Sequence, residues 1–109
     1  MTAPLIVNLE KVLASGRDSA LLRFGLGNAY LDAGEAVIAA AHLQKAVELN
    51  PKYSAAWKLL GKALTAADDP DGALAAYRNG VVAAQQMGDK QALREMQVFI
   101  RRLDKSDRE

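Results

Sequence analysis

Residues 57–64 of this chain read WKLLGKAL, and residues 23–30, which lie 34 positions earlier, read RFGLGNAY. The 34-residue interval aligns Leu60 with Leu26 and Gly61 with Gly27. Further along the chain it also pairs Tyr30 with Leu64, Ala39 with Ala73, Leu43 with Tyr77, and Ala46 with Gly80. A fixed period of this length is typical of helix–turn–helix units that stack, each covering the apolar face of the next. The period therefore predicts stacked helical hairpins.

Apolar spacing and end signals predict six helices and no strand. Asp18 and Asp69 are expected to be N-caps, while Gly34 and Gly88 are expected to end helices. Asp68 takes the place of Gly34 in the second copy, and aspartate tolerates a left-handed turn position. The expected helices span about 4–14, 18–33, 35–49, 54–67, 69–87 and 90–104, followed by a frayed tail over 105–109.

These positions resemble the tetratricopeptide repeat family, whose first helix carries W-x₂-L-G-x₂-Y and whose second carries A-x₃-F and a later proline. Trp57, Leu60 and Gly61 match the first run, and the pairs Ala39–Leu43 and Ala73–Tyr77 match the second. The chain departs from the pattern with Arg23 for tryptophan, Leu64 for tyrosine, Gly80 for alanine and Gln85 for proline. Without that proline, the second helix of the second copy is expected to run longer.

The resemblance implies an all-α fold, a short right-handed α-solenoid of about six helices in one domain over 1–109. It places repeat one at 20–53 and repeat two at 54–87. Helices at 4–15 and 88–104 would then act as half-repeat caps, which supply the neighbours that a two-repeat array lacks. Trp57 is expected to pack in the core, because it occupies the repeat's tryptophan position.

Composition excludes several classes of function. The 109 residues include no cysteine and one histidine, which gives no basis for thiol chemistry or a metal centre. The net charge is +1, which gives no basis for nucleic-acid binding or a charge-driven membrane role. His42 has no carboxylate at i±3 or i±4, so we expect a surface or half-buried helix histidine. The acidic run 68–71 lacks the spacing of a calcium loop. We therefore expect no enzyme, no cofactor and no metal, and, without a signal peptide or membrane span, a cytoplasmic protein.

The family resemblance implies a concave groove, lined by the first helix of each hairpin, that receives a peptide segment or helix of another protein. The residues expected there are Phe24, Asn28, Leu31, Lys58 and Lys62, together with Lys90 and Arg94 of the last helix. An apolar end and a basic end would suit an acidic segment with apolar anchors. The alternative is that these lysines only solvate an exposed face.

Two other functions stay open at this point. An end helix could mediate self-association by burying Val98, Phe99 or Ile100, which would give a monomer or a weak homodimer. The chain could also be the regulatory subunit of an enzyme. The sequence names neither the partner nor its pathway.

Overall fold

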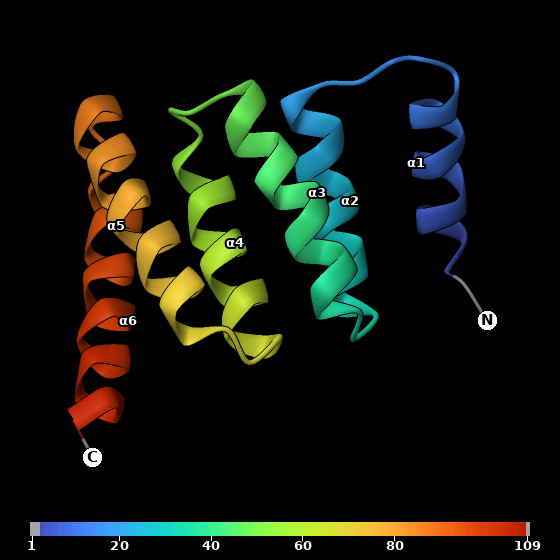
Figure 1. Ribbon diagram of the computed structural model, residues 1–109. Coiled ribbons are helices and arrows are strands. Elements are labelled where there is room, and N and C mark those ends of the chain that lie inside the picture. Colours follow the sequence, from blue (N-terminus) through green and yellow to red (C-terminus); the bar gives the residue numbers. More distant parts are fainter. Residues whose placement is uncertain (1–2, 109) are drawn as a thin grey trace.

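The fold is a stack of helices (Figure 1). The computed structural model describes residues 3–108, with side chains as far as Lys105. Its helices are α1 (Pro4–Ala14), α2 (Ala20–Asp32), α3 (Ala36–Leu49), α4 (Ser54–Ala66), α5 (Pro70–Met87) and α6 (Lys90–Arg108). Over the described residues there is no strand. The predicted all-α solenoid of six helices is confirmed.

The helices form two rows. The pairs α2–α3 and α4–α5 are hairpins, α1 packs on α2, and α6 packs on α5 and α4 (Figure 1). Cα atoms of α2 and α4, and of α4 and α6, come within 8 Å of each other, whereas those of α3 and α5 do not. The row α2–α4–α6 is therefore more closely spaced and forms the inner side of the curve.

Most helix ends follow the sequence signals, and the start of α2 is an exception. Ser19, not Asp18, is the N-cap: its hydroxyl accepts a 3.0 Å hydrogen bond from the backbone N–H of Leu22. Asp18 instead forms an ion pair with Arg23 at 2.9 Å. Asp69 caps α5 as predicted, because its carboxylate accepts from the N–H of Gly72.

The turns between paired helices show how an aspartate replaces a glycine. Asp68 has φ 62° and Gly34 has φ 80°, so both occupy the left-handed region at equivalent turns, as predicted. The missing proline also has its expected effect, since α5 has 18 residues and α3 has 14. The C-terminal expectation was wrong for the described residues: α6 continues to Arg108, so the tail after Asp104 is helical.

Three glycines allow the close approach of neighbouring helices. A Cβ added at Gly27 would overlap the side chain of Leu43, and one added at Gly61 would overlap the ring of Tyr77. At Gly80 it would meet Met96 of α6. Leu43, Tyr77 and Met96 are all 2% exposed or less, so each large side chain fills the space left by a glycine.

Trp57 connects the two parts of the core. Its side chain packs against the buried cluster around Leu43 and Leu60 and also against the cluster around Tyr77 and Met96. The indole Nε1–H donates a 2.7 Å hydrogen bond to the carbonyl oxygen of Pro51, which satisfies the polar atom of this otherwise apolar side chain. The prediction that Trp57 packs in the core is confirmed.

Two glycine-to-alanine substitutions should change stability in opposite directions. Gly61→Ala forces the Tyr77 ring to move and should lower the free energy of unfolding by about 1–3 kcal/mol. In Gly25→Ala the new methyl group meets Leu9 at an ordinary 3.8 Å, so the helix gains up to about 1 kcal/mol from propensity. Urea denaturation of both variants checks this. Equal effects would contradict the proposed role of Gly61.

Candidate functional site

The residues that the sequence predicts for a groove belong to α2, α4 and α6, the helices of the inner row. In α2, Phe24 and Leu31 are half-buried and pack against the core cluster, while Asn28 is exposed. The Phe24 ring stacks on that of Tyr53, with 5.0 Å between ring centroids. The buried part of both apolar residues therefore supports the fold, and only their outer part faces solvent.

Lys58 and Lys62 of α4 have different environments. The Lys58 ammonium donates a 3.1 Å hydrogen bond to Glu95 of α6, and this contact lowers the pKa of the Glu95 carboxyl. Lys62 is exposed, and its Nζ lies 5.5 Å from the centroid of the Phe99 ring. The pairing with α6 was not predicted, and it partly neutralises one of the two lysines.

Lys90 and Arg94 are exposed residues of α6. Helix α6 begins 36 residues after α4 (Ser54 to Lys90), not 34, so Arg94 occupies the position that Lys58 has in α4. At about 100° per residue, Arg94 lies roughly 100° around the helix from Glu95 and Lys90 roughly 140° from it. The side of α6 that meets Lys58 is therefore displaced from both predicted residues.

A hollow of about 360 Å³ lies where α4, α5 and α6 meet. The rings of Tyr77 and Phe99 are 5.3 Å apart there, and the guanidinium of Arg102 lies 5.9 Å from the Phe99 centroid. The lining residues are Lys62, Thr65, Ala66, Tyr77, Phe99, Arg102 and Leu103. Only Lys62 among them was predicted for the groove, because the 34-residue frame does not extend to α6.

Phe99 and Ile100 are less available for self-association than the sequence suggests. Both are half-buried and pack against the cluster formed by Tyr77, Met96 and their neighbours. Val98 is also half-buried. Their apolar surface is used mainly within the chain.

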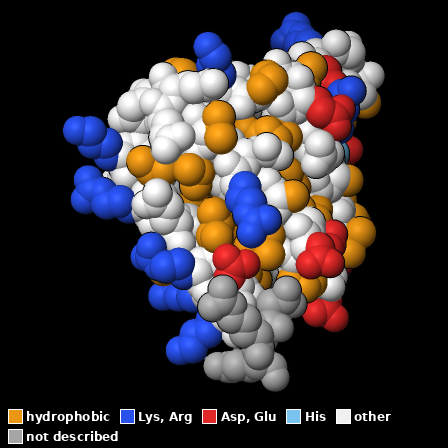
Figure 2. All heavy atoms as spheres, turned by 60° about the vertical axis from the view of Figure 1, so that its left-hand side comes forward, with side chains coloured by type: hydrophobic (Ala, Val, Ile, Leu, Met, Phe, Trp, Pro, Cys, Tyr) orange, Lys and Arg blue, Asp and Glu red, His pale blue; other side chains and the backbone are white. Residues whose placement is uncertain are grey.

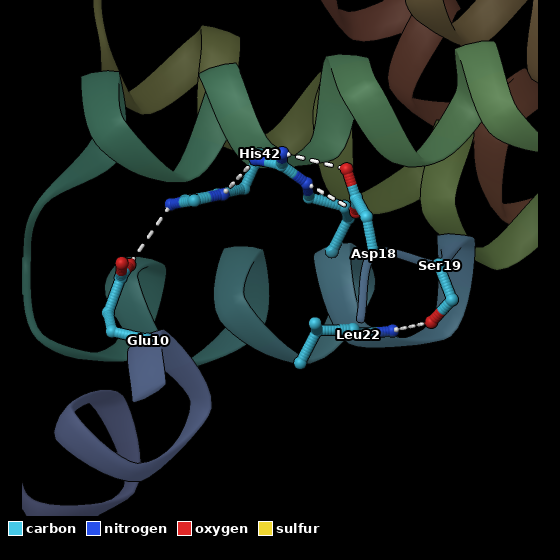
Figure 3. A network of polar contacts seen from close by, with 6 residues as sticks. Glu10, Asp18, Ser19, Leu22 and His42 are labelled. Atoms are coloured by element: carbon cyan, nitrogen blue, oxygen red, sulfur yellow. Dashed lines mark hydrogen bonds and ion pairs between the residues drawn. The ribbon is translucent and has the colours of Figure 1, made fainter. Parts of the chain in front are cut away.

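A network of polar side chains around His42 joins α1 to the first hairpin (Figure 3). His42 Nε2 lies 3.4 Å from Glu10 Oε1, and the Tyr30 hydroxyl donates to the same oxygen at 3.1 Å. Arg23 Nη1 lies 3.1 Å from His42 Nδ1 and also pairs with Asp18. Sequence reasoning missed the network because Glu10 is 32 positions from His42 and comes from another helix.

The contacts of His42 define its charge state. Arginine can only donate, so Nδ1 accepts from Arg23 and the ring proton lies on Nε2, towards Glu10. Burial lowers the pKa of His42 below its usual value and the Arg23 charge lowers it further, although Glu10 acts in the opposite direction. Neutral His42 stacks on the Tyr30 ring at 5.4 Å. The network holds α1 in place.

Two structural features are absent from the described residues, a cluster of metal-ligating side chains and a membrane-spanning helix. Among the side chains of residues 3–105 there is no group of three or more histidines and carboxylates placed to hold an ion. Within the same range no helix is both long and apolar enough to cross a bilayer.

Comparison with known proteins identifies the family. The tetratricopeptide repeat pattern matches residues 8–52 and 24–88. The chain belongs to the tetratricopeptide repeat family. A repeat-containing protein of Pseudomonas aeruginosa is 60% identical over 102 residues, which cover 94% of this chain and 97% of that relative.

Two solved structures have a similar arrangement of helices. The solution structure of protein BPP2914 from Bordetella parapertussis is 45% identical, with a TM-score of 0.81, and covers 98% of this chain and 92% of its own. The crystal structure of the Sgt2 TPR domain from Aspergillus fumigatus is 26% identical, with a TM-score of 0.75, and covers 95% of this chain and 69% of its own. Tetratricopeptide repeat proteins are generally interaction modules rather than enzymes, and this fold supports a protein–protein interaction module.

Acid should weaken the fold through His42. Because burial lowers its pKa in the folded state, the unfolded chain binds the proton more readily. The contribution of neutral His42 to stability is then fully present above the pKa of the unfolded chain, about 6.5, and is lost as the pH falls below that value. Denaturation at pH 7.5, 6.5 and 5.5 should show this loss in the wild type and a flatter profile in His42→Gln. The chain has one histidine, so equal slopes would contradict the assignment.

Proposed function

We propose that this tetratricopeptide repeat chain binds a segment of another protein in the groove along α2, α4 and α6, and that the segment is acidic with apolar anchors. The observation that supports this most directly is the position of Lys58 and Lys62 on α4, at the middle of the inner row. Apolar surface of Phe24 and Leu31 lies on the neighbouring helix α2. We propose further that the protein is located in the cytoplasm and that it is a monomer or a weak homodimer.

The lysines of the groove are distinct from those that only solvate the outside of the solenoid. Lys45 of α3 and Lys11 of α1 are exposed on other helices, outside the inner row. They have the same charge as Lys58 and Lys62 and therefore provide matched controls. Binding that depends on the groove should respond to one pair and not to the other.

A peptide-display screen against the wild type should enrich acidic sequences that carry apolar residues. Lys58→Gln with Lys62→Gln should weaken the selected peptides about tenfold, because two favourable charges are lost. Lys45→Gln with Lys11→Gln should leave their affinity unchanged, and circular dichroism should confirm equal helicity. Peptides without an acidic bias, or equal loss in both double variants, would contradict the proposal.

The Lys58–Glu95 pair provides a test in which affinity should increase. The Lys58 ammonium already forms an ion pair with Glu95 at 3.1 Å. A carboxylate of the bound segment must therefore compete with Glu95 for Lys58. Glu95→Gln should therefore raise the affinity for acidic peptides about two- to fivefold, in keeping with a partly exposed ion pair. Asp104→Asn is the control, since Asp104 pairs with Arg78 of α5 at 3.7 Å. Fluorescence polarisation with a selected peptide measures both variants, and an unchanged or lower affinity in Glu95→Gln would count against the groove.

A further inference from the structure

The hollow between α4 and α6 is large enough to accept one bulky side chain. Its volume of about 360 Å³ lies near the lower end of the roughly 300–1,000 Å³ typical of ligand pockets. Ala66 of α4 and Leu103 of α6 form part of its wall, and the rings of Tyr77 and Phe99 lie beside each other there. These surfaces are apolar, so the hollow favours an aliphatic or aromatic group over a polar one.

Two cations converge on this apolar surface. Lys62 Nζ and the Arg102 guanidinium lie 5.5 and 5.9 Å from the centroid of the same Phe99 ring, one from each helix. Among the side chains described here, neither cation forms an ion pair with a carboxylate, because Glu95 is engaged by Lys58 and Asp104 by Arg78. A ring face attracts a cation only weakly at an exposed site, about 0.5–1 kcal/mol, so both remain available to an anion.

On the wider surface at this end, exposed basic side chains outnumber exposed acidic ones among those described. As far as Lys105, α6 contributes Lys90, Arg94, Arg101, Arg102 and Lys105, and α5 contributes Arg78. Viewed from this end of the stack, most of the visible basic side chains gather along one edge, while most acidic ones lie towards the opposite side (Figure 2). An acidic partner therefore meets a favourable field before it reaches the hollow.

Of the two residues with a hydroxyl that line the hollow, Thr65 and Tyr77, the first already has a partner for its proton. The Thr65 hydroxyl donates a 2.8 Å hydrogen bond to the carbonyl oxygen of Gly61 within its own helix. The hollow therefore offers a ligand apolar contact and two positive charges. This combination selects an apolar side chain with a carboxylate close beside it.

We infer that the hollow holds one bulky apolar side chain of an acidic peptide segment, and that Lys62 and Arg102 bind the carboxylate of an adjacent residue. The inference rests on the proposed function and assigns the position of the apolar anchor. The anchor lies at the junction of α4 and α6, away from Phe24 and Leu31 of α2. Phe24 is half-buried and stacked on Tyr53, so part of its ring is already used within the fold.

The test uses three blocked nonapeptides and the full chain. The first has a central phenylalanine with two aspartates on each side, the second replaces the phenylalanine by alanine, and the third replaces the aspartates by lysines. Titration followed by ¹H–¹⁵N NMR should shift the amides of residues 62–66 and 99–103 with the first peptide. The alanine peptide should bind at least about tenfold more weakly, and the lysine peptide should give no shifts.

Variants separate the apolar contact from the charges. Ala66 is exposed on α4 and lines the hollow, so Ala66→Leu fills it without altering charge and should weaken the phenylalanine peptide about tenfold. Lys62→Gln with Arg102→Gln should weaken it similarly, whereas Lys45→Gln with Lys11→Gln, which removes two exposed charges on α3 and α1, should have little effect. Each variant is checked for unchanged helicity and melting temperature.

The possible results distinguish this inference from the proposed function. Amide shifts confined to Asn28, Leu31 and Lys58, and unaffected by Ala66→Leu, would contradict binding in the hollow. They would still be consistent with binding in the groove. Absence of binding by the phenylalanine peptide would also overturn the hollow, while Glu95→Gln, which acts through Lys58 and not through a lining residue of the hollow, tests the groove separately. Equal binding of the phenylalanine and alanine peptides would show that charge alone acts here, and the inference would fail.

Discussion

The structure depends on the close approach of helix backbones at Gly27, Gly61 and Gly80. Each glycine leaves room for one large side chain of the next helix, and those side chains are almost fully buried. Interiors pack at the density of organic crystals, so neither partner of such a pair can change size without strain or a void. Because the first two contacts recur 34 residues apart, they impose the same geometry on both hairpins and place α2 and α4 in one row.

The same packing forms the candidate site. Tyr77 is buried beneath Gly61, and its ring is also part of the surface on which Phe99 rests. Met96 fills the space above Gly80 and thereby fixes the rotation of α6 against α5. With α6 held in this rotation, Glu95 reaches Lys58, and Phe99 comes beside Lys62. A binding surface of this kind is rigid because its supporting side chains belong to the core.

The sequence could predict the features that recur with the repeat and those that depend on neighbouring residues. The small and large positions of the hairpins, the N-cap at Asp69 and the left-handed turn at Asp68 all follow from residue type and spacing. Contacts that cross between helices were not predictable in this way. His42 contacts Glu10 of α1, and Lys58 contacts Glu95 of α6. The sequence separations of these two pairs differ from the 34-residue repeat period, so the repeat does not predict them. The 36-residue spacing from α4 to α6 also shifts the register, so Phe99 and Arg102 could not be assigned to the groove.

The net charge of +1 is a sum that conceals how the charges are arranged. Glu95 and Asp104 of α6 are both engaged in ion pairs with the preceding hairpin, while the exposed basic residues of α6 face solvent. Partly exposed pairs of this kind add little stability, so their main effect is on where positive charge remains. The pairing of Lys58 with Glu95 reduces the charge near the start of α4 and leaves Lys62 and Arg102 as the cations beside the apolar hollow. Charge and apolar surface thus coincide at one place, and coincidence of the two gives a binding surface more specificity than either gives alone.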